Sequence, residues 1–136
     1  MKIIIAGAGE VGFHLAKLLS FESQDITLID NEKANLTYAD THLDIKVVKG
    51  NSASLAVLNE AEVSSADLMI AVTSSETTNF TTCVLAKQLG VKSTVARISN
   101  TEYVSSIGDI DFKSLGIDEL ISPEELASDE IQLLID

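Results

Sequence analysis

The chain alternates between short apolar runs and longer stretches in which apolar residues recur at helical spacing. Residues 2–6 form a β-branched run that stops at glycines, and residues 11–21 then carry apolar side chains three and four positions apart. Further strands are predicted at 26–29 and 45–48, with a helix at 32–42 between them. A βαβαβ unit is therefore complete by residue 50.

The same alternation continues through the second half of the chain. The pattern predicts a short helix at 54–61, a strand at 68–72, a helix at 76–89, a strand at 94–96, a weaker helix near 102–115 and a strand at 119–121. Parallel neighbours in a sheet need a crossover connection, and the crossovers here are helical. We therefore expect one α/β domain with a Rossmann-like, doubly wound, parallel sheet of six strands.

A final helix is expected at about residues 123–136. Ser122 can cap it, Pro123 suits its first position, and Glu125 stands three residues beyond the cap as a capping-box partner. Its apolar residues make a wider surface than one sheet contact requires: Leu126, Ala127, Ile131, Leu133, Leu134 and Ile135. Three interpretations stay open, namely packing on the sheet edge, a self-association face, or a chain cut from a longer protein.

Length and composition limit the classes of protein. The 136 residues, 46% of them hydrophobic, suit one domain rather than two. A net charge of −12 repels polyanions, which argues against a broad nucleic-acid or anionic-membrane surface. The apolar runs are too short to span a bilayer, and the first residues lack the features of a secretory signal. Because the single Cys83 cannot form an intrachain disulfide, we expect a cytoplasmic protein.

The negative charge is concentrated towards the C-terminus. Residues 1–100 hold eight basic and eleven acidic side chains, whereas residues 101–136 hold one basic and ten acidic. The first part is nearly balanced, as suits a domain that holds a phosphate group. We expect the acidic part to meet partner subunits or cationic groups, so that self-association depends on salt concentration.

A glycine-rich turn directly follows the first predicted strand. Gly7-Ala8-Gly9-Glu10-Val11-Gly12 fits the G-x-G-x-x-G pattern of dinucleotide-binding proteins. Gly7 would permit the tight turn, Gly9 would let a pyrophosphate approach the backbone, and Gly12 would let the helix pack closely on the strand. The turn opens a helix whose free N–H groups and positive dipole end favour phosphate. We expect the Glu10 side chain to face solvent or a partner chain, since a carboxylate facing phosphate would be repelled.

An acidic residue stands where such proteins hold ribose. Asp30 falls 18 residues after Gly12, at the end of the second predicted strand, where its carboxylate can accept hydrogen bonds from ribose hydroxyls. Glu32 adds negative charge that disfavours the 2′-phosphate of NADP, whereas the neighbouring Lys33 would favour it. The combination predicts an adenine dinucleotide or a related nucleoside as ligand.

Three further loops are expected on the same side of the sheet, where doubly wound folds bind ligands. Asn51 and Ser52 follow the third strand and can present backbone and amide groups to an adenine, and Thr73 and Ser74 follow the fourth strand, beside the pyrophosphate. Arg97, the only arginine, ends the fifth strand. Its guanidinium can pair with a phosphate or with an acidic loop, and the sequence does not choose between them.

The sequence offers little support for an enzyme. A dehydrogenase needs a substrate-binding part and an acid or base beside the nicotinamide, and the chain ends where the nucleotide fold ends. We expect His14 and His42 on the surface and Cys83 in the core, with no catalytic residue and no metal site. A methyltransferase would need a reversed final strand, but the residues after the last predicted strand begin a helix instead.

These segments together resemble the N-terminal nucleotide-binding domain of the Trk potassium-uptake protein A family, also called the RCK or KTN domain. The resemblance covers almost the whole chain. It is carried by residues 2–12, Asp30, residues 50–53, Ala66-Asp67, Thr73-Ser74-Ser75 with Asn79, Ala96-Arg97 with Asn100, and residues 116–119 before Ile121-Ser122-Pro123-Glu124.

The resemblance implies a regulatory subunit that is not an enzyme. Such a subunit is cytoplasmic, lies at the inner face of the plasma membrane through its partner, and controls a potassium channel or transporter. It binds NAD(H), or in relatives ATP and ADP, and it forms homodimers and larger rings in which the last helix crosses between subunits. The alternatives are a fragment of a nucleotide-dependent oxidoreductase and a freestanding redox-sensing dinucleotide-binding module.

Two departures from the family pattern sharpen these expectations. Relatives that favour ATP tend to have a basic residue in the phosphate loop, where this chain has Glu10, so we expect NAD(H), with ATP or ADP as alternatives. The family's smaller C-terminal domain and any second tandem copy are missing, so we expect the 136 residues to be a fragment of a longer protein.

Overall fold

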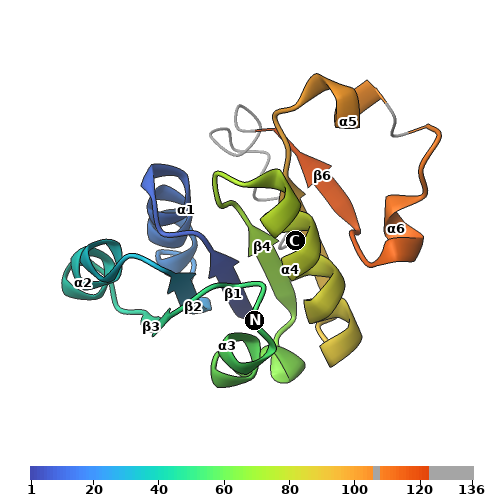
Figure 1. Cartoon of the computed structure of the whole chain (residues 1–136). Coiled ribbons are helices and arrows are strands. Elements are labelled where there is room, and N and C mark those ends of the chain that lie inside the picture. The colour runs from blue at the N-terminus through green and yellow to red at the C-terminus, as the bar shows by residue number, and fades with distance from the viewer. Residues whose placement is uncertain (106–107, 123–136) are drawn as a thin grey trace.

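The computed structural model describes residues 1–105 and 108–122, which form a parallel six-stranded sheet flanked by helices (Figure 1). The strand order is β3-β2-β1-β4-β5-β6, and all neighbouring strands run parallel. The strands are β1 (Lys2–Ala6), β2 (Asp25–Asp30), β3 (Lys46–Lys49), β4 (Leu68–Ala71), β5 (Ser93–Arg97) and β6 (Glu119–Ile121). The predicted α/β, doubly wound sheet is thus confirmed.

Helices connect the strands as the hydrophobic pattern predicted. They are α1 (Glu10–Ser20), α2 (Lys33–His42), α3 (Leu55–Glu60), α4 (Glu76–Leu89), α5 (Thr101–Ser105) and α6 (Phe112–Leu115), with a 3-10 turn, η1 (Val63–Ser65), after α3. The sequence pattern did not separate η1 from α3. The final helix expected at about residues 123–136 lies outside the described residues.

The prediction of a single weak helix near residues 102–115 is wrong. The described residues form two short helices there, and α6 has its own cap, because the Asp111 Oδ1 accepts a hydrogen bond from the Ser114 N–H at 3.2 Å. Gly116, at φ +105°, ends α6 after one turn in a backbone conformation that other residues rarely adopt. Local capping therefore divides a stretch whose apolar spacing alone is typical of one helix.

The two faces of the sheet bury different side chains of the same strands. Ile3 and Ile5 of β1 pack with residues of α1 and α2, whereas Ile4 and Ala6 pack with residues of α3 and α4. All four are fully buried. A central parallel strand covered on both faces is apolar at consecutive positions, which explains the uninterrupted isoleucine run in the sequence.

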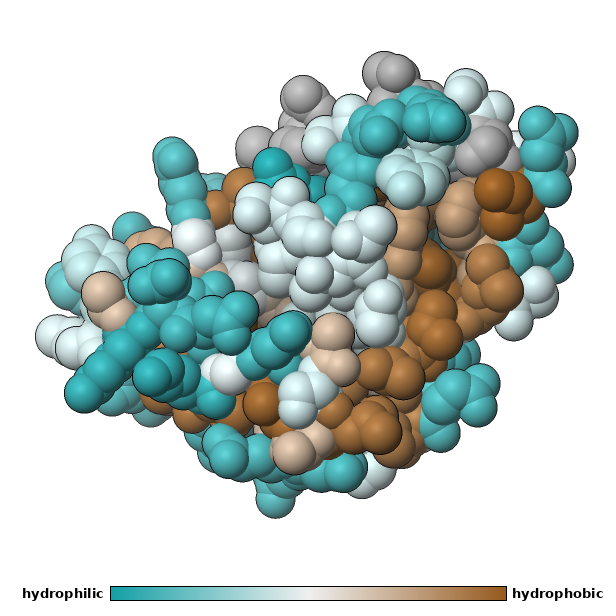
Figure 2. Space-filling view, in the orientation of Figure 1, coloured by the Kyte–Doolittle hydropathy of each residue, from teal (hydrophilic) through white to brown (hydrophobic). Residues whose placement is uncertain are grey.

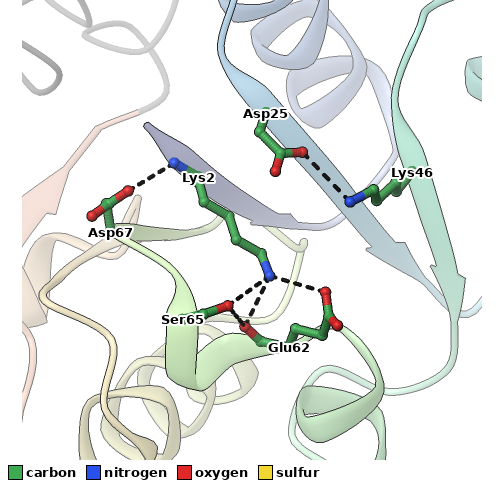
Figure 3. Close-up of polar contacts among 6 residues, drawn as sticks. All are labelled: Lys2, Asp25, Lys46, Glu62, Ser65 and Asp67. Carbon is green, nitrogen blue, oxygen red and sulfur yellow. Dashed lines mark hydrogen bonds and ion pairs between the residues drawn. The ribbon is translucent and has the colours of Figure 1, made fainter.

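Polar side chains fasten the beginnings of the strands, at the end of the sheet shown in Figure 3. The Asp67 carboxylate, just before β4, accepts the Lys2 N–H at 2.8 Å and pairs with the Lys92 ammonium at 3.1 Å. The Lys2 ammonium reaches the carboxylate and the carbonyl oxygen of Glu62, each at 3.2 Å. These contacts tie β1 to the segment that leads into β4.

Asp118, which lies just before β6, ties that strand to α4 and to the beginning of β5. Its Oδ2 accepts hydrogen bonds from the Lys87 ammonium at 2.8 Å and from the Thr94 N–H at 2.9 Å. Burial by itself would raise the pKa of the Asp118 carboxyl. The hydrogen bonds from Lys87 and Thr94 together lower that pKa by more than burial raises it, so the pKa lies below its usual value. The charged form of Asp118 therefore stabilises the fold.

The surface over α4 and α6 is more apolar than its surroundings (Figure 2). Phe80 and Val84 of α4 are only partly buried there, and Phe80 contacts Phe112 of α6 with ring centroids 5.9 Å apart. Within residues 1–105 and 108–122, no helix is both long and apolar enough to cross a membrane.

Replacing Asp118 by Asn should lower the free energy of unfolding by about 1–3 kcal/mol at pH 7, because the partly buried Lys87 loses its charged partner. The difference from the parent should shrink as the pH falls below about 4, because the unfolded chain binds a proton at Asp118 first and the folded carboxylate, with its lowered pKa, binds one only at lower pH. Urea unfolding at several pH values measures both effects. Asp25→Asn is the control: its carboxylate is half exposed and 3.9 Å from Lys46, so we expect almost no change.

Candidate functional site

A cleft of about 590 Å³ opens at the carboxyl ends of the strands. It lies at the switch point of the fold, where the chain has built β2 and β3 on one side of β1 and then crosses to β4 on the other. Its lining comes from the ends of β1 to β5 and from the first turns of α1 and α4. Ligands of doubly wound folds bind at this place.

The glycine turn forms the floor of the cleft, and each glycine has a different reason to be there. Gly7 has φ +112°, and a Cβ on it would lie 2.9 Å from the Thr73 nitrogen. A Cβ on Gly12 would overlap the Gly7 carbonyl oxygen, so the close contact is with the turn itself rather than with a strand. A Cβ on Gly9 would have no neighbour within 4 Å. Gly7 and Gly12 are therefore required by packing, whereas Gly9 borders open space.

Helix α1 begins inside the cleft. Gly9 is its N-cap, in extended conformation, and no described side chain caps the helix. The Phe13 N–H donates to the Gly9 carbonyl at 2.9 Å, so the unsatisfied N–H groups are those of the first turn, which point out of the helix end. The residues of that turn, Glu10, Val11 and Gly12, line the cleft. Such an end attracts anions.

Asp30 holds the glycine turn as well as bordering the cleft. Its Oδ1 accepts the Ala8 N–H at 2.9 Å, and its Oδ2 accepts the Glu32 N–H at 2.9 Å and the Asn35 side-chain amide at 3.2 Å. A carboxylate has about four lone-pair sites, and three are occupied here. Asp30 therefore has capacity for about one further donor.

The loops after β3 and β4 use several of their polar side chains internally. Asn51 accepts the Ala53 N–H through its Oδ1 at 2.9 Å, which shapes its own turn. The Ser52 hydroxyl is buried and shares a hydrogen bond of 2.8 Å with Thr82 of α4. Both residues line the cleft, so Ser52 offers it backbone rather than its hydroxyl.

Asn79 organises the loop that follows β4. This fully buried side chain accepts the Thr73 N–H through Oδ1 at 2.9 Å and donates from Nδ2 to the carbonyls of Thr73 and Arg97 at 3.1 and 3.2 Å. It thus joins the ends of β4 and β5. Thr73 and Ser74 are presented to the cleft by this arrangement.

Arg97 lines the cleft, and no ion pair to it occurs among residues 1–105 and 108–122. The structural ion pair considered for Arg97 is therefore absent from that part of the chain. Among the described residues that line the cleft, Arg97 is also the only basic one, and three carry carboxylates, Glu10, Asp30 and Glu32. The cleft consequently has one strong anion-binding side chain and an acidic wall.

The cleft brings together all eleven predicted ligand residues: Gly7, Gly9, Glu10, Val11, Gly12, Asp30, Asn51, Ser52, Thr73, Ser74 and Arg97. Sequence reasoning did not assign Asn35 and Thr78, which also line the cleft, or the organising role of Asn79. The sequence did contain a signal for Asn79. Its side-chain amide lies in the first turn of a helix that packs on the sheet, and a buried amide there needs hydrogen-bond partners from the nearby strand ends.

The other candidate side chains lie away from the cleft. His14 and His42 are exposed, and His42 stacks on Tyr38 with ring centroids 4.0 Å apart. Cys83 is buried, and burial raises the pKa of its thiol to about 12, so it is protonated at neutral pH. Among the described residues, no three His, Cys, Asp or Glu side chains gather as metal ligands would.

Strand order, glycine turn and cleft together define a Rossmann-type α/β domain. The chain belongs to the TrkA-N domain family, whose model matches residues 3–123. It is 44% identical over 137 residues to the Trk system potassium uptake protein TrkA of Haemophilus influenzae, with 99% of this chain and 30% of that protein covered. The chain spans 30% to 60% of the length of the curated relatives it matches first.

Solved structures with the same fold include nucleotide complexes. The TrkA-N domain of the inner membrane protein YbaL from Escherichia coli superposes with a TM-score of 0.78 at 15% identity, covering 99% of this chain and 96% of that one. The GsuK channel bound to NAD superposes with a TM-score of 0.73 at 17% identity, covering 88% of this chain and 21% of that one. At these identities the likeness concerns the fold.

Alanine at Gly12 should reduce stability much more than alanine at Gly9. Gly12→Ala forces a methyl group onto the Gly7 carbonyl and should cost about 3 kcal/mol or more of unfolding free energy. Gly9→Ala meets open space at an ordinary backbone conformation, so it should cost at most about 1 kcal/mol. Urea unfolding of both variants checks this, and an equal loss in the two would contradict the assigned roles.

Proposed function

We propose that this chain is the nucleotide-binding regulatory domain of a potassium-uptake system and that its ligand is NAD(H). The observation that carries the proposal is the start of α1, where an uncapped helix end and the open space at Gly9 lie in the same cleft as Arg97. A pyrophosphate placed there would meet first-turn N–H groups on one side and a guanidinium on the other.

Asp30 and Glu32 would hold the adenosine ribose. Asp30 has about one acceptor site left after binding the Ala8, Glu32 and Asn35 donors, so it would take one hydroxyl. Glu32 is exposed on the same wall and would take the other. Two carboxylates at this position also repel the 2′-phosphate of NADP, which favours NAD(H).

The charge of the cleft favours NAD(H) over ATP and ADP. Glu10 lines the phosphate end, and Arg97 is the single basic side chain of the lining. ATP and ADP carry terminal phosphates with several negative charges, whereas the pyrophosphate of NAD(H) carries two. The acidic wall therefore penalises ATP most, although ADP and ATP stay possible ligands, as the GsuK channel has also been solved bound to ADP.

The names of the relatives support regulation of a membrane partner. The curated relatives are named for potassium uptake, and the GsuK protein with the same fold is a channel. We propose that this domain forms a homodimer or a larger assembly, through residues of about 123–136 among others. It would lie in the cytoplasm, held at the inner face of the membrane through a channel or transporter subunit whose activity it controls.

An oxidoreductase fragment is the second candidate, since the fold is shared with enzymes: ChuY, an anaerobilin reductase from Escherichia coli, superposes with a TM-score of 0.62. The lining of the cleft argues for regulation instead. It contains no His, Lys, Tyr or Cys among the described residues, and in the proposed arrangement its carboxylates would lie beside the ribose and the phosphates rather than beside a nicotinamide.

The test is a calorimetric titration of the chain with NADH, NAD, ATP, ADP and S-adenosylmethionine. We expect NADH or NAD to bind most tightly, and Gly9→Ala to weaken that binding by at least about tenfold, because its methyl group occupies the place of the pyrophosphate. A preference for S-adenosylmethionine, or unchanged NADH affinity in the stable Gly9→Ala variant, would overturn the proposal.

Removing the charge of Glu10 should relax the selection against ATP. Glu10→Gln should raise the affinity for ATP by about three- to tenfold and change that for NADH by less, since ATP carries more negative charge near this position. The same titrations measure both. Glu22→Gln, which removes one exposed carboxylate beyond the far end of α1, is the matched control and should leave both affinities unchanged.

A further inference from the structure

Two side chains of α4 form hydrogen bonds with the backbone at the end of β5 and just after it. Asn79 donates to the Arg97 carbonyl at 3.2 Å. Glu76, three residues earlier on α4, reaches the next residues along: its Oε1 accepts the Ser99 N–H at 3.1 Å and the Asn100 N–H at 2.8 Å. The Ser99 hydroxyl donates to the same oxygen at 3.0 Å. Residues 97–100 are thus clamped to the first turns of α4.

Glu76 makes these contacts at an energetic cost. All three hydrogen bonds go to Oε1, whereas Oε2 is buried without a hydrogen-bond partner. Leaving a buried carboxylate oxygen unpaired is unfavourable. Glu76 keeps this arrangement despite that cost, so the three hydrogen bonds that fix residues 97–100 outweigh it.

The clamped segment carries the side chain on which phosphate binding depends. Arg97 lies at its first position, lines the cleft and has no ion pair within residues 1–105 and 108–122. A long, unpaired side chain loses conformational entropy when it binds, and a fixed backbone reduces that loss. Glu76 itself does not line the cleft, so it can act on a ligand only through this segment.

We infer that Glu76 is a positioning residue of the nucleotide site, which acts by holding residues 97–100 so that the Arg97 guanidinium faces the ligand phosphates. The inference rests on the proposed nucleotide function. It adds a determinant of affinity that lies outside the glycine turn and belongs to α4.

The test is a double-mutant cycle with NADH as the probe. Arg97→Gln should weaken NADH binding by about tenfold or more, because a charge-assisted hydrogen bond to phosphate is lost. Glu76→Ala should weaken it by about five- to tenfold in the parent, but by less than about twofold when Arg97 is already Gln, because the two residues act as one unit. Glu76→Gln keeps an acceptor for the Ser99 and Asn100 N–H groups and should restore most of the affinity.

Two comparisons make the outcome decisive. Asp118→Asn, at the opposite end of the sheet, controls for lost stability: it should destabilise the fold and leave NADH affinity unchanged. If Glu76→Ala unfolds the chain, Glu76→Asp, whose carboxylate is one methylene shorter and cannot reach Ser99 and Asn100 in the same way, takes its place with and without Arg97→Gln, and additive losses there overturn the inference. Equal effects of Glu76→Ala in the two backgrounds, or full NADH affinity in Glu76→Ala, also overturn it. Failure of the parent to bind NADH would instead overturn the proposed function.

Discussion

The close approach of the Gly7 carbonyl to the Cα of Gly12 is the contact on which the cleft depends. It lets α1 start within four residues of the end of β1, so the uncapped end of the helix faces the space at the carboxyl ends of the strands. Any side chain at Gly12 would overlap that carbonyl. The same turn brings Gly7 against Thr73, which places the ends of β1 and β4 side by side at the switch point.

Buried or half-buried polar side chains hold the rest of the cleft in place. Asp30 ties the glycine turn to the loop before α2, and Asn79 and Glu76 tie the ends of β4 and β5 to α4. Each of these groups spends most of its hydrogen-bonding capacity on the protein itself. The walls are consequently set before a ligand arrives, which reduces the entropy lost on binding.

The electrostatics of the molecule combine a strongly acidic chain with one local anion site. A net charge of −12 would repel a nucleotide, yet the helix end at Gly9 and the single Arg97 offer a phosphate two favourable partners. Under the proposed function, the carboxylates on the cleft wall, Glu10, Asp30 and Glu32, would select by charge, because each added phosphate increases the repulsion.

The sequence by itself determined the sheet, its order of elements and much of the cleft lining, although not Asn35 and Thr78. Apolar runs and helical spacing mark each strand and helix locally, and in a parallel fold every residue that follows a strand must reach the same edge. It could not show that residues 102–115 form two helices, because the Asp111 cap and Gly116 override the apolar spacing. Nor could it show that Ser52 faces Thr82, that Asp30 spends three of its acceptor sites on the protein, or that Glu76 clamps residues 97–100. Apart from the local bonds of Asp30 to Glu32 and Asn35, those pairings join residues 22 to 30 positions apart, and only tertiary packing decides which donors meet which acceptors.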